Sequence, residues 1–130
     1  MKYQEGYKYQ LAEDYIQEIR WLVPYKYVSN YLSVIDGVLT CCRGYAWDGA
    51  SGPAWDTDNF MVPSLVHDAL YQLMRLGVIP HRSRKLADAL LYSMCLERNM
   101  WRIRAWYVLN AVRIFGGSAA RKPRKVLTAE

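Results

Sequence analysis

The chain has 130 residues, of which 52% are hydrophobic and 22% are charged, and its formal net charge is +5 at pH 7. This length fits one domain that buries enough surface for a core, and it leaves no room for a second domain. The odd number of cysteines, Cys41, Cys42 and Cys95, and the lack of any CxxC pair exclude a disulfide framework and a cysteine zinc site. We therefore expect reduced, buried thiols.

The positive charge is concentrated at the C-terminus. Residues 118–130 hold four basic residues and one acidic residue, which gives +3 and leaves +2 for residues 1–117. We expect residues 1–117 to form a single globular domain and residues 118–130 to form a basic, flexible tail. A solvated end is favoured over a binding segment, and contact with nucleic acid or acidic lipid, the alternative, would be made through this tail.

Neither a signal peptide nor a membrane span is recognised in the sequence. The first ten residues, MKYQEGYKYQ, lack an apolar stretch, and no apolar run approaches the ~18–20 residues that a spanning helix requires.

The N-terminal half has the period of β-strands. Tyr7, Tyr9 and Leu11 alternate with polar residues, and residues 31–42 predict a strand, a tight turn at Asp36-Gly37 and a second strand. The segment Leu11–Val23 is ambiguous, because its apolar residues also fit a helical stripe that Pro24 would end. We favour a strand through Leu11 and leave the remainder open.

The C-terminal half predicts three helices. The first covers residues 60–76, with Asn59 as its N-cap, Pro63 in its first turn and Gly77 as its stop. The second covers residues 83–98 with Ser83 as its cap, and the third covers about 100–115. The predicted fold class is α+β, with a small N-terminal antiparallel sheet packed on about three C-terminal helices.

The predicted third helix interleaves aromatic and basic residues. Trp101, Arg102, Arg104 and Trp106 could contact nucleic acid, but helical spacing favours a packing helix with a charged outer face.

The segment from Gly44 to Tyr71, GYAWDGASGPAWDTDNFMVPSLVHDALY, is the most informative part of the chain. It joins a loop rich in glycine and aspartate to the first predicted helix. Glycines let the backbone turn its carbonyls inward, and the carboxylates add negative charge around them. Such a loop suits a hard cation.

Polar residues on the first two helices form a candidate site. Ser64, His67 and Tyr71 share one face of the first helix, and Asp68 follows His67 directly. A neutral imidazole beside a carboxylate can be a general base. Asp88 lies at the rim of the apolar face of the second helix, where it needs a partner, and we expect it to accept a hydrogen bond from His67 or Tyr71. This bond would serve either helix packing or catalysis.

The motifs GYAWDGASGP and LVHDALY, followed by Leu86-Ala87-Asp88, resemble a phage and prophage family catalogued as domain of unknown function 1353, over residues 31–117. More distantly, the glycine-rich loop followed by His-Asp-x-x-Tyr is similar to the secreted phospholipases of the A2 class. The chain differs from those enzymes in having no cysteines beside the His-Asp pair.

The resemblance to the phospholipases implies a role for each matching position. His67 would be the base, Asp88 would orient it and Tyr71 would support it. Calcium would be held by Asp68 and by backbone carbonyls among Trp47, Gly49 and Ser51.

Two functions are thus left open. The first is a phage or prophage accessory protein with a calcium-dependent, phospholipase-like site that hydrolyses phospholipid or another ester. The second is a non-catalytic virion, tail or host-interaction protein, binding other phage or host proteins, in which the same residues are structural. In either case we expect the host cytoplasm or the virion as its location.

Overall fold

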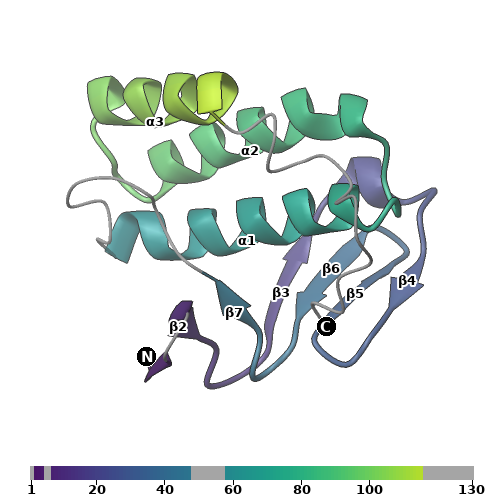
Figure 1. Cartoon of the computed structure of the whole chain (residues 1–130). Coiled ribbons are helices and arrows are strands. Elements are labelled where there is room, and N and C mark those ends of the chain that lie inside the picture. Colours follow the sequence, from purple (N-terminus) through teal and green to yellow (C-terminus); the bar gives the residue numbers. More distant parts are fainter. Residues whose placement is uncertain (1, 5–6, 48–57, 116–130) are drawn as a thin grey trace. The chain divides into compact units, whose positions relative to one another are not determined.

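The structure is a computed structural model that describes residues 2–4, 7–47 and 58–115. These residues fall into two compact units (Figure 1). The strand unit (residues 2–47) contains every strand, and the helical unit (residues 58–115) contains the α-helices. The predicted α+β class is confirmed, while the predicted tail, residues 118–130, lies outside the described residues.

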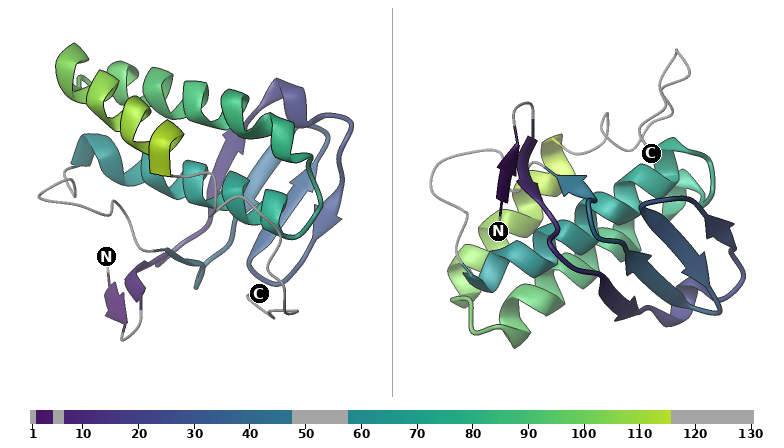
Figure 2. Two further views of the ribbon diagram at one scale, coloured as in Figure 1. Left: turned by 45° about the horizontal axis from the view of Figure 1, so that its top comes forward. Right: turned by 90° about the horizontal axis from the view of Figure 1, so that it is seen from below.

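The strand unit has two antiparallel sheets (Figure 2). In the first, the strand order is β1-β2-β7, and the strands are β1 (Lys2–Gln4), β2 (Tyr7–Gln10) and β7 (Ala46–Trp47). In the second, the order is β3-β6-β5-β4, and the strands are β3 (Tyr15–Glu18), β4 (Tyr27–Val28), β5 (Leu32–Ile35) and β6 (Val38–Cys41).

The predicted hairpin is confirmed. Ile35 pairs with Val38, so Asp36 and Gly37 alone form the turn. Both have positive φ, 51° and 79°, as a type I′ hairpin turn requires. A side chain at Gly37 would also meet the side chain of Val23 at 2.9 Å, so glycine is favoured there twice over.

The ambiguous segment Leu11–Val23 contains a strand and a short 3-10 helix rather than a long helix. Strand β2 ends at Gln10, and after β3 the helix η1 (Arg20–Leu22) buries Leu22 completely. Between the sheets, the Leu11 amide donates to the Tyr45 carbonyl at 2.8 Å, and the Gly44 amide donates to the Leu11 carbonyl at 2.9 Å. Backbone pairing thus continues from one sheet to the next.

The helical unit consists of α1 (Asp58–Arg75), α2 (Arg84–Glu97) and α3 (Arg102–Phe115), with the 3-10 turn η2 (His81–Ser83) before α2. Helix α2 packs on both α1 and α3 (Figure 1). The described part of the chain contains no helix long and apolar enough to cross a membrane.

The predicted start of the first helix is wrong. Helix α1 begins at Asp58, so Asn59 lies inside it and is not the N-cap, and Pro63 lies beyond the first turn. Proline there removes one backbone hydrogen bond, to the carbonyl of Asn59, and the helix continues through it. The start signals at Asn59 and Pro63 therefore do not determine where α1 begins.

The predicted stop at Gly77 is confirmed. Gly77 has a φ of 77°. Its amide donates to the Met74 carbonyl, and the Val78 amide donates to the Leu73 carbonyl. These two bonds form a Schellman motif. Helix α2 ends in the same way with Asn99 in place of glycine, at φ of 68°.

The other predicted helix boundaries are partly right. Ser83 occupies the N-cap position of α2, but its side chain makes no capping bond because its backbone is helical, as the last residue of η2. Helix α3 begins at Arg102 and not at Met100, since Met100 belongs to the turn that follows α2.

The cysteines are all free, as expected. Burial raises the pKa of Cys41 to about 12. Burial also raises the pKa of Cys95, to about 11, and the positive charges of Arg104 and Arg98 partly oppose that increase. Cys42 is only half-buried, so the expectation of three buried thiols is correct for two.

Candidate functional site

The predicted contact between His67 on α1 and Asp88 on α2 is present. His67 Nε2 lies 2.7 Å from Asp88 Oδ1. The histidine is 7% exposed and the aspartate 1% exposed. A carboxylate in such a place must be hydrogen-bonded, because an unpaired buried charge is strongly unfavourable.

Tyr71 donates a second hydrogen bond to the same carboxylate oxygen, also at 2.7 Å. It lies one helical turn after His67, and the two rings are 4.2 Å apart between centroids. Burial, together with the bond to Asp88, raises the pKa of the Tyr71 hydroxyl above its ordinary value. Tyr71 therefore keeps its proton at neutral pH and remains a donor.

The bond to Asp88 also determines which nitrogen of His67 can act as a base. A carboxylate accepts, so Nε2 carries the proton and the lone pair of a neutral imidazole lies on Nδ1. Within the described residues the structure gives Nδ1 no hydrogen-bond partner, and no wholly buried side-chain nitrogen there lacks one. Nδ1 is thus the ring nitrogen that the bond to Asp88 leaves able to act as a base.

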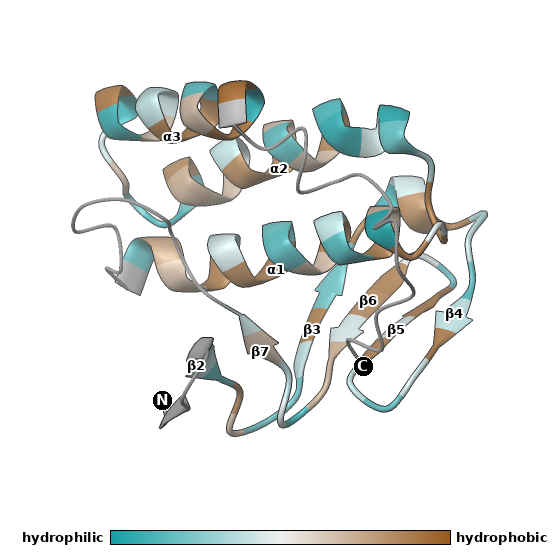
Figure 3. Ribbon diagram, viewed as in Figure 1, coloured by the Kyte–Doolittle hydropathy of each residue, from teal (hydrophilic) through white to brown (hydrophobic). Residues whose placement is uncertain are grey.

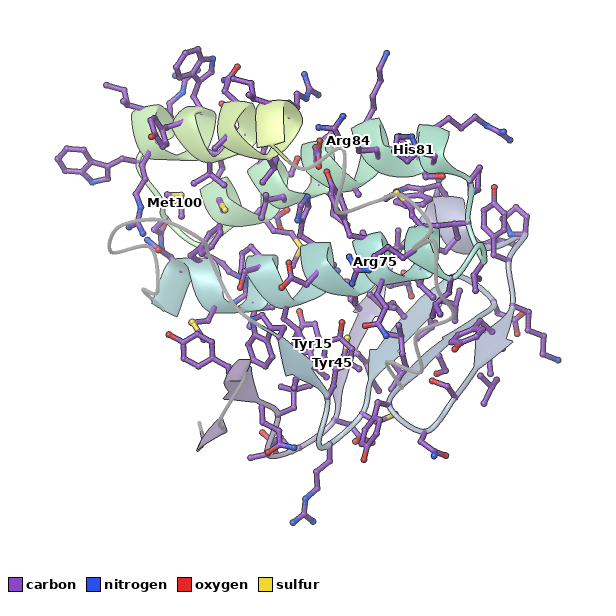
Figure 4. All side chains as sticks on the ribbon, in the orientation of Figure 1. Tyr15, Tyr45, Arg75, His81, Arg84 and Met100 are labelled. Atoms are coloured by element: carbon purple, nitrogen blue, oxygen red, sulfur yellow. The ribbon has the colours of Figure 1, made fainter. Side chains whose placement is uncertain are left out.

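Arg84, at the beginning of α2, completes the network. Its Nε donates to the Tyr71 hydroxyl at 3.2 Å and lies 3.9 Å from Asp88 Oδ2. Its Nη2 donates to the Val112 carbonyl at 2.9 Å and to the Arg113 carbonyl, so that it reaches the last turn of α3 (Figure 4). We call His67, Tyr71, Arg84 and Asp88 the four-residue network.

Arg84 was not among the predicted site residues. The sequence does carry one signal for it, because Arg84 and Asp88 are four residues apart and therefore share a helix face. The bonds to α3 have no such local signal, since they depend on how α3 packs.

Ser64 was expected on the face of α1 that carries His67 and Tyr71. Its hydroxyl donates to the Met61 carbonyl at 2.8 Å. This bond back to the helix backbone is common for serine within a helix.

The predicted calcium ligands that the structure describes belong to different units. Trp47 belongs to β7 in the strand unit, where its ring lies 5.6 Å from that of Tyr9. Gly49 and Ser51 lie outside the described residues, as does most of the acidic loop. Asp68 lies on α1 and is partly exposed.

Residues 2–4, 7–47 and 58–115 contain no group of three or more histidine, cysteine or acidic side chains that could hold a metal ion. Calcium takes about six to eight oxygen ligands. Among the predicted ligands the helical unit provides Asp68, while the loop positions Gly49 and Ser51 lie outside the described residues, so the calcium site stays a prediction.

Comparison with known proteins adds no relative. No protein-family model, curated protein or solved structure matches the chain significantly. The resemblances to the phage family and to the phospholipases stay predictions that rest on the motifs.

Proposed function

We propose that the chain is a hydrolase of ester bonds in which His67 and Asp88 form the catalytic dyad. The observation that carries this proposal is the buried 2.7 Å contact of Nε2 with Asp88, which leaves Nδ1 as the basic nitrogen. A histidine oriented in this way is the arrangement that a general base needs.

The chemistry follows from the tautomer. Nδ1 would take a proton from a water molecule as the water oxygen attacks the ester carbonyl carbon. Asp88 would stabilise the resulting imidazolium through its bond to Nε2–H. Nδ1–H would then return the proton to the departing alkoxide oxygen, which leaves an acid, an alcohol and neutral His67.

Tyr71 and Arg84 would act through Asp88 and not on the substrate. Tyr71 donates to the oxygen that His67 uses, and Arg84 lies near the other oxygen. Together they hold the carboxylate plane fixed, and the imidazole with it. They are positioning residues.

The substrate class, phospholipid or another ester, and the setting in a phage or prophage are proposed from the motif resemblance. Calcium, held by Asp68 and the glycine-rich loop, belongs to the same proposal and would polarise the ester carbonyl when bound.

A specific observation favours the alternative, a non-catalytic virion or host-interaction protein. The network also ties three helices together, because Arg84 binds the last turn of α3 while Asp88 binds α1. Structural networks use the same geometry as catalytic ones.

Hydrolysis assays distinguish the two functions. The purified chain is incubated with a short-chain phosphatidylcholine and with a soluble nitrophenyl ester, each with calcium or with chelator. We expect hydrolysis that falls at least ~10²-fold in His67→Ala, which lacks the general base. Asp88→Asn should also lower the rate.

The matched control is His81→Ala, because His81 is the chain's other histidine and is exposed on η2. It should retain the rate. Hydrolysis that persists in a folded His67→Ala protein contradicts the dyad, and the absence of hydrolysis under all conditions favours the structural alternative.

A further inference from the structure

Helix α3 has an exposed face that is mostly apolar, with one polar residue, Asn110, whose side-chain amide donates to the Trp106 carbonyl at 2.8 Å. Its isoleucines are 81% and 71% exposed, and its aromatic residues are more than half exposed. These residues, Ile103, Trp106, Tyr107 and Ile114, recur at the spacing of one helix face, and we call them the α3 outer face.

The opposite side of α3 is buried against α2. Ala105 and Val108 pack into a core cluster with Leu91 and Cys95 of α2. The outer face is therefore a second apolar surface, not the face that holds α3 in place. The outer side of α3 is not only charged, as was expected, because exposed isoleucine and aromatic side chains accompany its exposed arginines. Hydrophobic and hydrophilic residues both occur along this helix (Figure 3).

The charged residues of α3 itself are all positive. Helix α3 contains Arg102, Arg104 and Arg113 and no acidic residue. Arg102 and Arg113 are exposed on the side of the face nearer to Trp106. Two copies of α3 meeting face to face would bring these arginines together without a carboxylate of the helix to neutralise them. The partner that fits is anionic.

The exposed isoleucines favour lipid over nucleic acid. Aromatic and arginine side chains serve either partner, since both stack on bases and both occur at membrane surfaces. Isoleucine offers no stacking surface to a base and no donor to a phosphate, whereas it is stabilised when it leaves water for acyl chains. Ile103 and Ile114 lie near the two ends of the face.

We propose that the α3 outer face binds the surface of an anionic lipid bilayer. The helix lies in the plane of the interface, with the isoleucines among the upper acyl chains, Trp106 and Tyr107 at the level of the headgroups, and the arginines on the lipid phosphates. The proposal does not rest on ester hydrolysis, because none of these residues belongs to the four-residue network.

Co-sedimentation with vesicles tests the proposal. The full chain is mixed with vesicles of phosphatidylcholine containing 30% phosphatidylglycerol, or of phosphatidylcholine alone. We expect binding to the anionic vesicles that weakens with salt and at least about tenfold weaker binding to the neutral ones. Ile103→Ser combined with Ile114→Ser should weaken binding by at least about tenfold, since two apolar side chains no longer insert.

The control is Ile16→Ser, which removes an isoleucine of β3 in the strand unit that is also exposed, at 63%. It should bind as the unchanged chain does. The basic segment at residues 121–125 is present in every variant. If the chain were attracted to vesicles through that segment alone, all variants would bind equally well, and this result would overturn the proposal. Binding to an oligonucleotide without binding to vesicles would overturn it too, as would a dimer that Ile103→Ser and Ile114→Ser dissociate.

Discussion

Arg84 donates a hydrogen bond to the backbone carbonyl of Val112, and this bond ties the beginning of α2 to the last turn of α3. The last carbonyls of a helix have no partner within the helix and carry its negative end charge. The Arg84 guanidinium donates to these carbonyls and places a positive charge at the negative end of α3. The same guanidinium also donates to the Tyr71 hydroxyl. The anchoring of α3 and the orientation of Asp88 thus depend on one side chain.

We predict that Arg84→Met lowers the free energy of unfolding by about 1–3 kcal/mol, because hydrogen bonds from a charged donor are lost. Arg84→Lys should recover part of this, since it keeps the charge but not the fork of donors. Urea denaturation measures both. Arg82→Met, an exposed arginine on η2, serves as the control, and equal losses in the two methionine variants would contradict the anchoring role.

His67 and Asp88 should behave as one unit in stability. Residues in one hydrogen-bond network show interaction energies of ~0.5–3 kcal/mol in a double-mutant cycle, whereas separate sites are additive. We expect this coupling for His67→Ala with Asp88→Asn, measured by chemical denaturation. The comparison pair is His67→Ala with Glu97→Gln, an exposed residue at the end of α2, which should be additive. Additivity in both cycles would mean that the dyad does not exist in solution.

The raised pKa of Tyr71 predicts a loss of stability at alkaline pH. Burial makes the folded state hold the phenolic proton more tightly than the unfolded chain does. This contribution is complete below pH ~10, the ordinary pKa of tyrosine, and declines above it, because the unfolded chain releases the proton first. Cys41 and Cys95 add slopes of the same sign.

Tyr71→Phe isolates the tyrosine, since both cysteines are retained. The variant should be less stable at pH 8, because Asp88 loses a donor, and should lose stability less steeply between pH 10 and 11. Unfolding free energies from urea titrations at each pH give the two slopes. Parallel slopes would show that Tyr71 is not responsible.

The calcium prediction is tested by thermal unfolding. A ligand that binds only the folded state stabilises it by RT ln(1 + [L]/Kd), which is ~2.7 kcal/mol at a hundredfold excess over Kd. We expect millimolar calcium to raise Tm, and Asp68→Asn to reduce the increase. A Tm that calcium leaves unchanged would count against the metal site.

The local features of the fold were predictable from the sequence. The turn at Asp36-Gly37 and the stop at Gly77 depend on positive φ, which residue type largely determines. The contact between His67 and Asp88 was also predictable, because a carboxylate at the rim of an apolar face must find a donor on the next helix. In these cases the physical cause is contained within a few residues.

The features that were missed depend on tertiary packing. The early start of α1 contradicts the signals at Asn59 and Pro63, since one lost backbone bond is tolerated in a helix that packing stabilises. The contact of Arg84 with the Val112 carbonyl requires the position of α3, which no local pattern gives. The outer face of α3 was predicted to be charged because helical spacing does not distinguish which of two apolar faces is buried.

The pairing of Tyr9 with Trp47 has a consequence for the order of folding. These partners stand at opposite ends of the strand unit's sequence, so a long loop must close before β2 and β7 meet, and closure of such a loop slows folding. The helices, by contrast, contact their neighbours along the chain. Pulsed hydrogen exchange during refolding should therefore protect the amides of α1 and α2 before those of β2.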